Sequence, residues 1–591
     1  MKYAFSRARL ARPTLAGLAF ICAASLNSWG RNPSTEAKPH TVAAQPASRS
    51  TPWWKHAVIY EVYPRSFQDS TGDGIGDLNG ITDRLDYLQN LGINAIWLTP
   101  IYPSPQHDFG YDISNYEAID PMYGTLAQFD TLLAEAKKRH IRVIMDLVLN
   151  HTSDQHPWFQ ESRSSRNNPK RDWYIWRDGK GPGIPPNNWQ SDFGHSAWTY
   201  DAKTQQWYYH KFLAQQPDLN WRNPEVRKAM YDVERFWLNR GVAGFRLDAI
   251  TTLFEDPQLR DEKVLGGKNE YGDPNISDDR TNNLPEVHDV LRELRKIADS
   301  YPENRVLIGE TYLPDVQELA KTYGAHDDEL QLPMDTQVGF IDKLSADAFR
   351  QKISEAENDL HGNQPLFVFD NHDNPRSWNR YGDGVHDAAI ARIAAAILLT
   401  TRSTALMYYG QEIGMVTTQP KTKSEVRDPA GLVGWPKYKG RDGERTPMQW
   451  NAGKDAGFST AAETWLPVAP DYKTVNVQVE SENSRSLYAW YKTLIAMRRD
   501  NPALRDGDNI MLNRSDPNVL SYLRKNPGNG PSVLVAMNFT AEPRTVSFDL
   551  KDNGILSPQA KTLLQDGSVP ASVSLDHVKL APFAVYIGQV Q

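Results

Sequence analysis

Residues 141–148 read Ile-Arg-Val-Ile-Met-Asp-Leu-Val, an apolar run followed closely by Asn150 and His151. A short run rich in Ile and Val that ends in polar residues is typical of a strand buried in a parallel sheet. The pattern returns at 242–249, Val-Ala-Gly-Phe-Arg-Leu-Asp-Ala. Both runs predict strands whose C-terminal ends carry charged or hydrogen-bonding side chains.

Six more apolar runs have this form, and amphipathic stretches separate most of the eight. The candidate strands are 57–60, 93–98, 141–148, 242–247, 306–308, 330–333, 366–369 and 405–409. The clearest helical patterns are 125–139, 225–239, 285–298 and 388–399. Eight strands, each followed by a helix, predict an α/β fold, the (β/α)8 TIM barrel. A doubly wound parallel sheet is the alternative that this pattern leaves open.

Two long intervals between predicted strands and a change in the hydrophobic pattern mark the domain organisation. Residues 151–217 are rich in Trp, Pro, Asn and Gly, too long for a connection, and predict a small domain inserted after the third strand. A long loop, 415–478, follows the eighth strand. After a helix predicted at 486–498, short alternating runs predict a C-terminal antiparallel β-sandwich domain. The expected barrel parts are 53–150 and 218–505, flanking the inserted domain B, 151–217, and preceding the β domain, 506–591.

Composition excludes several function classes. The chain has 591 residues, a net charge of −8 and 40% apolar residues, which is too apolar for general disorder and too acidic to coat nucleic acid. The single cysteine, Cys22, excludes an intramolecular disulfide and a Cys-rich zinc site.

The N-terminus has the layout of a signal peptide. Basic residues precede an apolar stretch, 15–26, that is too short to span a membrane, and Ala23 and Ala24 near its end provide small residues for cleavage. We therefore expect a signal peptide, 1–24, a flexible linker, 25–52, and an exported protein, periplasmic or secreted, whose mature form has no membrane contact. An uncleaved membrane anchor is the alternative.

Three carboxylates follow three of the predicted strands. Asp248, Glu310 and Asp373 come within four residues of the ends of the fourth, fifth and seventh. In such a barrel the active site lies at the C-terminal ends of the strands, so we expect the three to converge. A single carboxylate at a strand end commonly caps a helix or supports a loop, but three at the same end predict a catalytic site.

Four blocks of the sequence resemble the signature regions of glycoside hydrolase family 13, the α-amylase family. They are 146–151, 244–249, 309–311 and 369–373. Three others, 216–220, 409–414 and 445–450, are similar to its α-glucosidase and oligo-1,6-glucosidase branch. One departure is the run 402–405, which reads Arg-Ser-Thr-Ala where many relatives read Arg-Gly-Thr-Pro. It lies at the start of a predicted strand and leaves the catalytic residues unaffected.

The resemblance implies a retaining glycosidase, which uses two carboxyl groups about 5–5.5 Å apart. Asp248 matches the nucleophile that forms a covalent glucosyl ester, Glu310 the acid/base, and Asp373 the third carboxylate, which binds sugar hydroxyls. Arg246, two residues before Asp248 on one strand, is placed to keep that carboxylate ionised.

The resemblance also implies a pocket for one glucose. His151 and His372 match histidines that hydrogen-bond sugar hydroxyls, Tyr111 the ring that stacks on the sugar, and Asp108 a carboxylate for its terminal hydroxyls. Arg445 resembles the arginine that pairs with Asp108 and closes the pocket. A closed pocket predicts an exo-acting α-glucosidase on small oligosaccharides, a monomer or homodimer without an organic cofactor.

Residues 69–77 predict a calcium loop. Asp69, Thr71, Asp73, Ile75 and Asp77 place oxygen groups at alternate positions of a Gly-rich loop, as in the first part of an EF-hand loop. The twelfth position lacks the bidentate Glu, but relatives of this branch hold a single, structural metal ion here. We expect Ca²⁺; a metal-free Asp/Gly turn is the alternative.

Ala249, directly after the nucleophile, predicts the linkage. Relatives that prefer α-1,6 bonds tend to carry Val there, and those that prefer α-1,4 bonds carry Ala or Thr. A methyl-sized group beside the acceptor sugar discriminates by about 1–3 kcal/mol. We expect a preference for short α-1,4-linked sugars. A glucosyltransferase, a sucrose or trehalose isomerase, an oligo-1,6-glucosidase and an inactive binding barrel are the rival functions.

Overall fold

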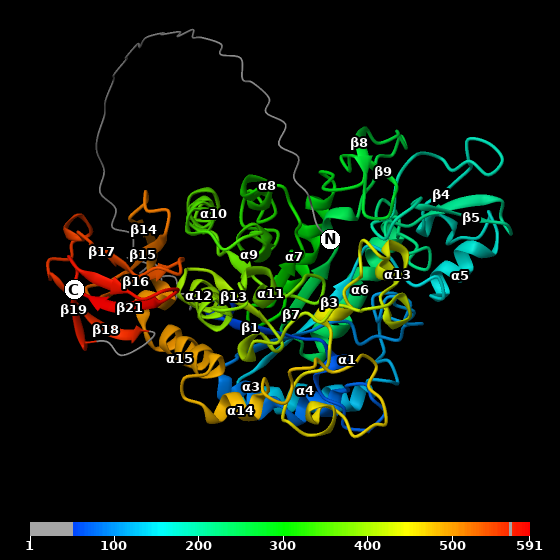
Figure 1. Ribbon diagram of the computed structural model, residues 1–591. Coiled ribbons are helices and arrows are strands. Elements are labelled where there is room, and N and C mark those ends of the chain that lie inside the picture. The colour runs from blue at the N-terminus through cyan, green and yellow to red at the C-terminus, as the bar shows by residue number, and fades with distance from the viewer. Residues whose placement is uncertain (1–50, 566–569) are drawn as a thin grey trace, which may run out of the picture. The chain divides into compact units, whose positions relative to one another are not determined.

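The computed structural model describes residues 51–565 and 570–591 (Figure 1). The predicted signal peptide, and the predicted linker up to residue 50, lie outside the described residues. Among the described helices, none is both long and apolar enough to cross a membrane.

Eight parallel strands close into a barrel, in the order β1-β13-β12-β11-β10-β7-β3-β2. They are β1 (Val58–Val62), β2 (Ala95–Leu98), β3 (Arg142–Val148), β7 (Gly244–Asp248), β10 (Val306–Gly309), β11 (Leu332–Asp335), β12 (Leu366–Val368) and β13 (Thr404–Tyr408). All eight predicted strands are present. The doubly wound alternative is excluded, because β1 pairs with both β2 and β13 and leaves no open edge.

Helices follow the strands and cover the barrel (Figure 1). The longer ones are α4 (Leu126–Lys138), α6 (Pro224–Arg240), α7 (Val287–Asp299), α10 (Ala346–Asp359), α12 (Asp387–Thr400) and α15 (Leu487–Asp500). The shorter ones are α1 (Pro64–Phe67), α2 (Leu78–Asp83), α3 (Leu85–Leu91), α5 (Pro157–Ser164), α8 (Val316–Lys321), α9 (Thr336–Gly339), α11 (Ser377–Tyr381), α13 (Pro429–Gly434), α14 (Val477–Glu482) and α16 (Pro502–Asp506).

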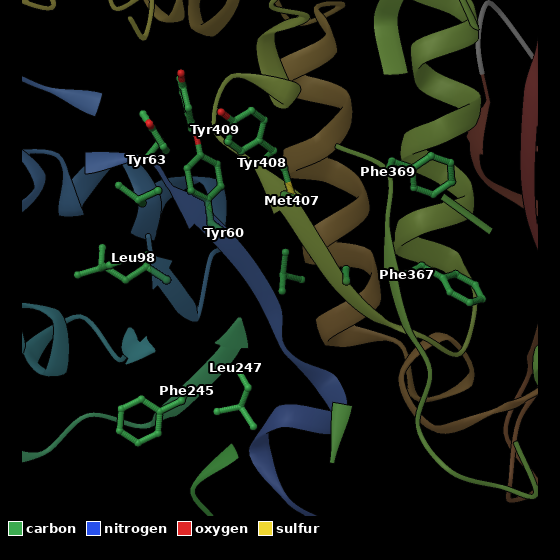
Figure 2. Close-up of a cluster of buried hydrophobic side chains, with 14 of the residues drawn as sticks. Tyr60, Tyr63, Leu98, Phe245, Leu247, Phe367, Phe369, Met407, Tyr408 and Tyr409 are labelled. Carbon is green, nitrogen blue, oxygen red and sulfur yellow. The ribbon is translucent and has the colours of Figure 1, made fainter. Parts of the chain in front are cut away.

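The barrel strands are buried on both faces. Their outward side chains pack with the helices in a large apolar cluster that includes Tyr60, Phe245 and Met407 (Figure 2). Ile59, Ile144 and Ile308 belong to a second cluster. Because side chains alternate along a strand, the residue two positions after each of these three points the same way. Those residues are Glu61, Asp146 and Glu310, so this face changes from apolar to charged at the C-terminal ends of the strands.

Two β-rich parts accompany the barrel. Within 151–217, β4 (Trp176–Arg177), β5 (Trp198–Asp201) and β6 (Gln206–Tyr209) form an antiparallel sheet. The C-terminal part has a six-stranded sheet and a two-stranded ladder that share one apolar core. Its strands are β14 (Asp508–Leu512), β15 (Val519–Lys525), β16 (Ser532–Asn538), β17 (Arg544–Val546), β18 (Gln559–Gln565), β19 (Ser572–Ser574), β20 (Val578–Leu580) and β21 (Val585–Val590).

A hairpin after β7 was not predicted from the sequence. Its strands, β8 (Val264–Lys268) and β9 (Pro274–Ile276), pair in antiparallel fashion, and β8 is exposed throughout. Without a buried face, the hairpin has no apolar alternation that sequence reading could detect.

Helix α6 carries a buried, unpaired carboxyl. Asn223 caps its N-terminus by accepting a hydrogen bond from the backbone N–H of Glu225, and Gly241 ends it in the left-handed conformation. On the buried side, Glu234 is fully covered, and neither of its carboxyl oxygens has a hydrogen-bond partner in the described part of the chain. Burial raises the pKa of Glu234 well above its ordinary value.

We predict that Glu234→Met stabilises the protein by about 1–3 kcal/mol, because it removes an unpaired buried polar group. The pKa of Glu234 is higher in the folded than in the unfolded protein, so wild-type stability falls as the pH rises from the unfolded pKa towards the folded one. The gain should therefore be larger at pH 8 than at pH 5 in thermal unfolding. Glu482→Met, an exposed control on α14, should change little, and an equal gain at both pH values would contradict the prediction.

Candidate active site

The guanidinium of Arg246 lies at the centre of a group of carboxylates. Its Nη1 is 2.5 Å from Asp248 Oδ1 and 3.1 Å from Asp146, and its Nη2 is 2.6 Å from Glu310 Oε1. Arg246 is 1% exposed, so these charge-assisted contacts replace its hydration. The structure thus brings Asp248 and Glu310 together from β7 and the end of β10, with Arg246 beside Asp248 as predicted.

Burial makes both carboxyls hold a proton more readily than exposed ones do. It raises the pKa of Glu310 to about 8 and that of Asp248 to about 7, and in both cases Arg246 opposes the rise. The side chains of both remain 10% exposed. An acid and a nucleophile require that one carboxyl of such a pair is protonated while the other is ionised.

Ala249 connects the two carboxyls through the backbone. It adopts the left-handed conformation, with φ 45° and ψ 38°, which is uncommon for a residue other than glycine. In this conformation its N–H donates a 2.8 Å hydrogen bond to Glu310 Oε2. The residue after Asp248 therefore orients Glu310.

Asp373 lies in a second cluster of positive charge. Its Oδ1 is 2.9 Å from Arg441 and 2.8 Å from Arg445, and its Oδ2 is 3.3 Å from His372 Nε2. Burial raises the pKa of Asp373, but the neighbouring His372, Arg441 and Arg445 lower it more, so the net pKa lies well below the ordinary value. Its side chain remains 21% exposed and ionised, available to hydroxyl donors.

Asp108 pairs with Arg441, which corrects the predicted pairing with Arg445. Arg441 Nη2 is 2.7 Å from Asp108 Oδ1 and 2.8 Å from Asp428 Oδ1, whereas Arg445 pairs with Asp373. The two arginines lie four positions apart in one loop, and the motif did not decide which of them reaches Asp108. Gln216 also donates to Asp108, at 3.1 Å.

The two predicted histidines contact Tyr111 at different atoms. The His372 ring is parallel to the Tyr111 ring, with centroids 5.4 Å apart, and its Nε2 is 2.7 Å from the Tyr111 hydroxyl. His151 Nε2 is 3.2 Å from the backbone oxygen of Tyr111 and 3.1 Å from Gln216. Burial lowers the pKa of His151 to about 3, so this ring is neutral.

Sequence reading missed four residues that contact the predicted set. They are Glu61, Asp146, Gln216 and Arg441. Asp146 and Gln216 lie within quoted motifs and were passed over. Glu61 ends an apolar run, as Asp248 and Glu310 do, so the same rule applied to the first strand would have found it.

The loop 69–77 is organised by hydrogen bonds to its own carboxylates. Asp69 accepts from the backbone N–H groups of Thr71, Gly72 and Gly74, at 2.7–2.9 Å. Asp77 caps α2 by accepting from Gly80. Within the described residues, no group of three or more His, Cys, Asp or Glu side chains is arranged to hold a metal ion. As arranged here, the acidic side chains of the loop do not converge on one cation, and Ca²⁺ binding there stays a prediction.

Comparisons with known proteins agree on one family. The model of the alpha amylase catalytic domain matches residues 61–507. A probable alpha-glucosidase of Rhizobium meliloti (strain 1021) is 42% identical over 84% of this chain and 91% of its own, and an oligo-1,6-glucosidase of Parageobacillus thermoglucosidasius is 38% identical over 91% and 99%. The crystal structure of the trehalulose synthase from Pseudomonas mesoacidophila MX-45 aligns with a TM-score of 0.83, at 36% identity, covering 92% of this chain and all of its own.

The calcium prediction has a direct test. A cation that binds only the folded loop should raise the melting temperature by about 2–3 °C at a hundredfold excess over Kd. Treatment with a chelator should therefore lower the melting temperature, and added Ca²⁺ should restore it. An unchanged melting temperature, together with no calcium in elemental analysis, would establish the metal-free turn instead.

Proposed function

The chain belongs to the α-amylase family of glycoside hydrolases, and we propose that it is a retaining, exo-acting α-glucosidase acting on short α-1,4-linked maltooligosaccharides. The observation that carries this proposal is the contact of one guanidinium, Arg246, with both Asp248 and Glu310. Such a contact keeps a nucleophile and an acid together in a buried site. Similarity to an alpha-glucosidase and an oligo-1,6-glucosidase supports the substrate class.

In the first step, Asp248 attacks the anomeric carbon of the terminal glucose, and the bond to the leaving sugar breaks. The proton of Glu310 passes to the leaving oxygen, so that the sugar departs as an alcohol. The product is a covalent β-glucosyl ester on Asp248. Arg246 stabilises the ionised nucleophile before attack.

In the second step, Glu310, now ionised, takes a proton from water. The water oxygen attacks the anomeric carbon, the ester bond to Asp248 breaks, and α-D-glucose leaves with its original configuration. The ion pair between Asp373 and its two arginines keeps this carboxylate negative, where it accepts hydrogen bonds from sugar hydroxyls and favours the positively charged transition state.

The exo mode is supported by the Arg441 contacts. Arg441 joins Asp108 to both Asp373 and Asp428, linking residues that are distant in the chain around the predicted glucose site. Gln216 joins Asp108 to His151. A site closed in this way accepts one terminal sugar and excludes a chain that continues beyond it.

Glucosyl transfer is the second candidate. The structural likeness to a trehalulose synthase favours it, since a synthase is named for the sugar that it makes. A sugar hydroxyl would then replace water in the second step. Product analysis at high maltose concentration separates the two, because transfer yields larger or rearranged glucosides and hydrolysis yields glucose alone.

We predict that maltotriose gives glucose and maltose as first products and that soluble starch is a poor substrate. Released glucose should initially be the α-anomer, measured by polarimetry or NMR. Asp248→Asn and Glu310→Gln should each retain no more than a few per cent of maltose turnover. Rapid loss of starch viscosity would contradict the exo mode, and first-formed β-glucose would contradict retention.

A carboxyl pair that must hold one proton predicts a bell-shaped pH dependence of kcat/KM. Activity requires Asp248 ionised and Glu310 protonated, so it falls below a pKa of about 7 and above one of about 8, both belonging to the coupled pair. In Glu310→Gln, an aryl α-glucoside with a good leaving group should keep the acid limb and lose the alkaline limb. An alkaline limb that persists in this variant would assign it to another group.

Ala249→Val should lower kcat/KM for maltose relative to isomaltose by about tenfold or more. The positive φ adds a cost, because a β-branched residue is strained in the left-handed region, so both activities should fall. Ala249→Gly, which fits this backbone and adds no bulk, is the control and should keep the wild-type ratio. A wild-type enzyme that already prefers isomaltose would refute the α-1,4 assignment.

A further inference from the structure

The carboxyl group of Glu61, on β1, contacts the His372 ring at Nδ1. Its Oε1 lies 2.7 Å from His372 Nδ1 and 3.3 Å from the backbone nitrogen of the same residue. The backbone N–H can only donate, so Oε1 is an acceptor at this position. Contact of one carboxyl oxygen with both the ring and the backbone of His372 fixes the position of the imidazole ring against β1.

The opposite ring nitrogen faces the predicted glucose site. This atom, Nε2, lies 2.7 Å from the Tyr111 hydroxyl and 3.3 Å from Asp373 Oδ2. Burial lowers the pKa of His372 well below its ordinary value, and the neighbouring Asp373 opposes this change.

The second carboxyl oxygen of Glu61, Oε2, makes no hydrogen bond within the described residues. The side chain is fully buried. Burial raises the pKa of Glu61 well above its ordinary value; Arg246 opposes the rise, while Asp373 and Asp146 add to it. A buried carboxyl with one free oxygen is costly, which argues for a role at the ring it contacts.

We propose that Glu61 is a positioning residue of the glucose site, which holds the His372 ring in place so that Nε2 forms a hydrogen bond with one glucose hydroxyl. The proposal rests on the proposed function, because it takes glucose as the sugar bound there. Glu61 itself does not touch the sugar. Its effect passes through the orientation of the His372 ring, as an outer ligand orients a histidine at a metal site.

The test compares Glu61→Met, which has similar length and no acceptor, with Glu61→Gln, whose amide oxygen can accept from both nitrogens. Binding of D-glucose and of its 2-, 3-, 4- and 6-deoxy analogues is measured by calorimetry. Binding does not require turnover. Failure of the wild type to hydrolyse maltose would therefore count against the proposed function alone, while the comparison of variants judges the role of Glu61.

In Glu61→Met we expect glucose affinity to fall about tenfold, the scale of one hydrogen bond to a charged or polarised group. The analogue that lacks the hydroxyl bound by His372 should lose nothing further, since the contact is already absent. The other analogues should weaken as glucose does. Glu61→Gln should bind all five sugars within about twofold of wild type, because one acceptor replaces another in the same place.

Glu412→Met is the matched control. Glu412 is also fully buried and accepts from Tyr60, a neighbour of Glu61 on β1. Its loss should lower the melting temperature and leave the pattern of sugar affinities unchanged. Equal weakening of all five sugars in Glu61→Met, wild-type affinity in that variant, or a Gln variant as weak as Met would each overturn the proposal.

Discussion

The burial of one positive charge, Arg246, governs the site. A guanidinium that is 1% exposed inside a barrel is tolerated only if anions replace the water it has lost, and Asp146, Asp248 and Glu310 do so. The carboxylates depend on the arginine in the same way, since burial raises their pKa values and Arg246 limits the rise. Removal of Arg246 would leave three buried carboxyls without their shared counter-charge. The chemistry and the stability of this end of the barrel are therefore linked.

A second set of ion pairs, around Arg441 and Arg445, has a different role. It keeps Asp373 ionised and connects it to Asp108 and Asp428. The first set suits bond breaking, and the second suits recognition of hydroxyl groups. Asp373 and its neighbour His372 lie where the two sets meet, and the ring of His372 also contacts Tyr111 and Glu61. This position explains why a residue behind His372 affects sugar binding in our proposal.

The fold was predictable because its signals are local and repeated. Each barrel strand is buried on both faces, so it appears in the chain as a continuous apolar run, and the eight runs are present as strands. The meeting of Asp248 and Glu310 was predictable for a related reason, since strand ends determine where their side chains lie. The hairpin β8–β9 lacks a buried face, and the partner of Asp108 depends on how a long loop folds. Neither feature has a periodic signal in the sequence.

The sequence by itself determined the order of strands and helices, the positions of Asp248, Glu310 and Asp373 at strand ends, and the family. These depend on hydrophobic periodicity and on short motifs, both properties of neighbouring residues. Only the tertiary structure decided that Arg441 pairs with Asp108, that Ala249 turns its N–H toward Glu310, and that Glu61 contacts His372. Glu61 and His372 are 311 positions apart. Their contact follows from closure of the barrel, which places the strands β1, β13 and β12 side by side and leaves buried polar groups to satisfy one another.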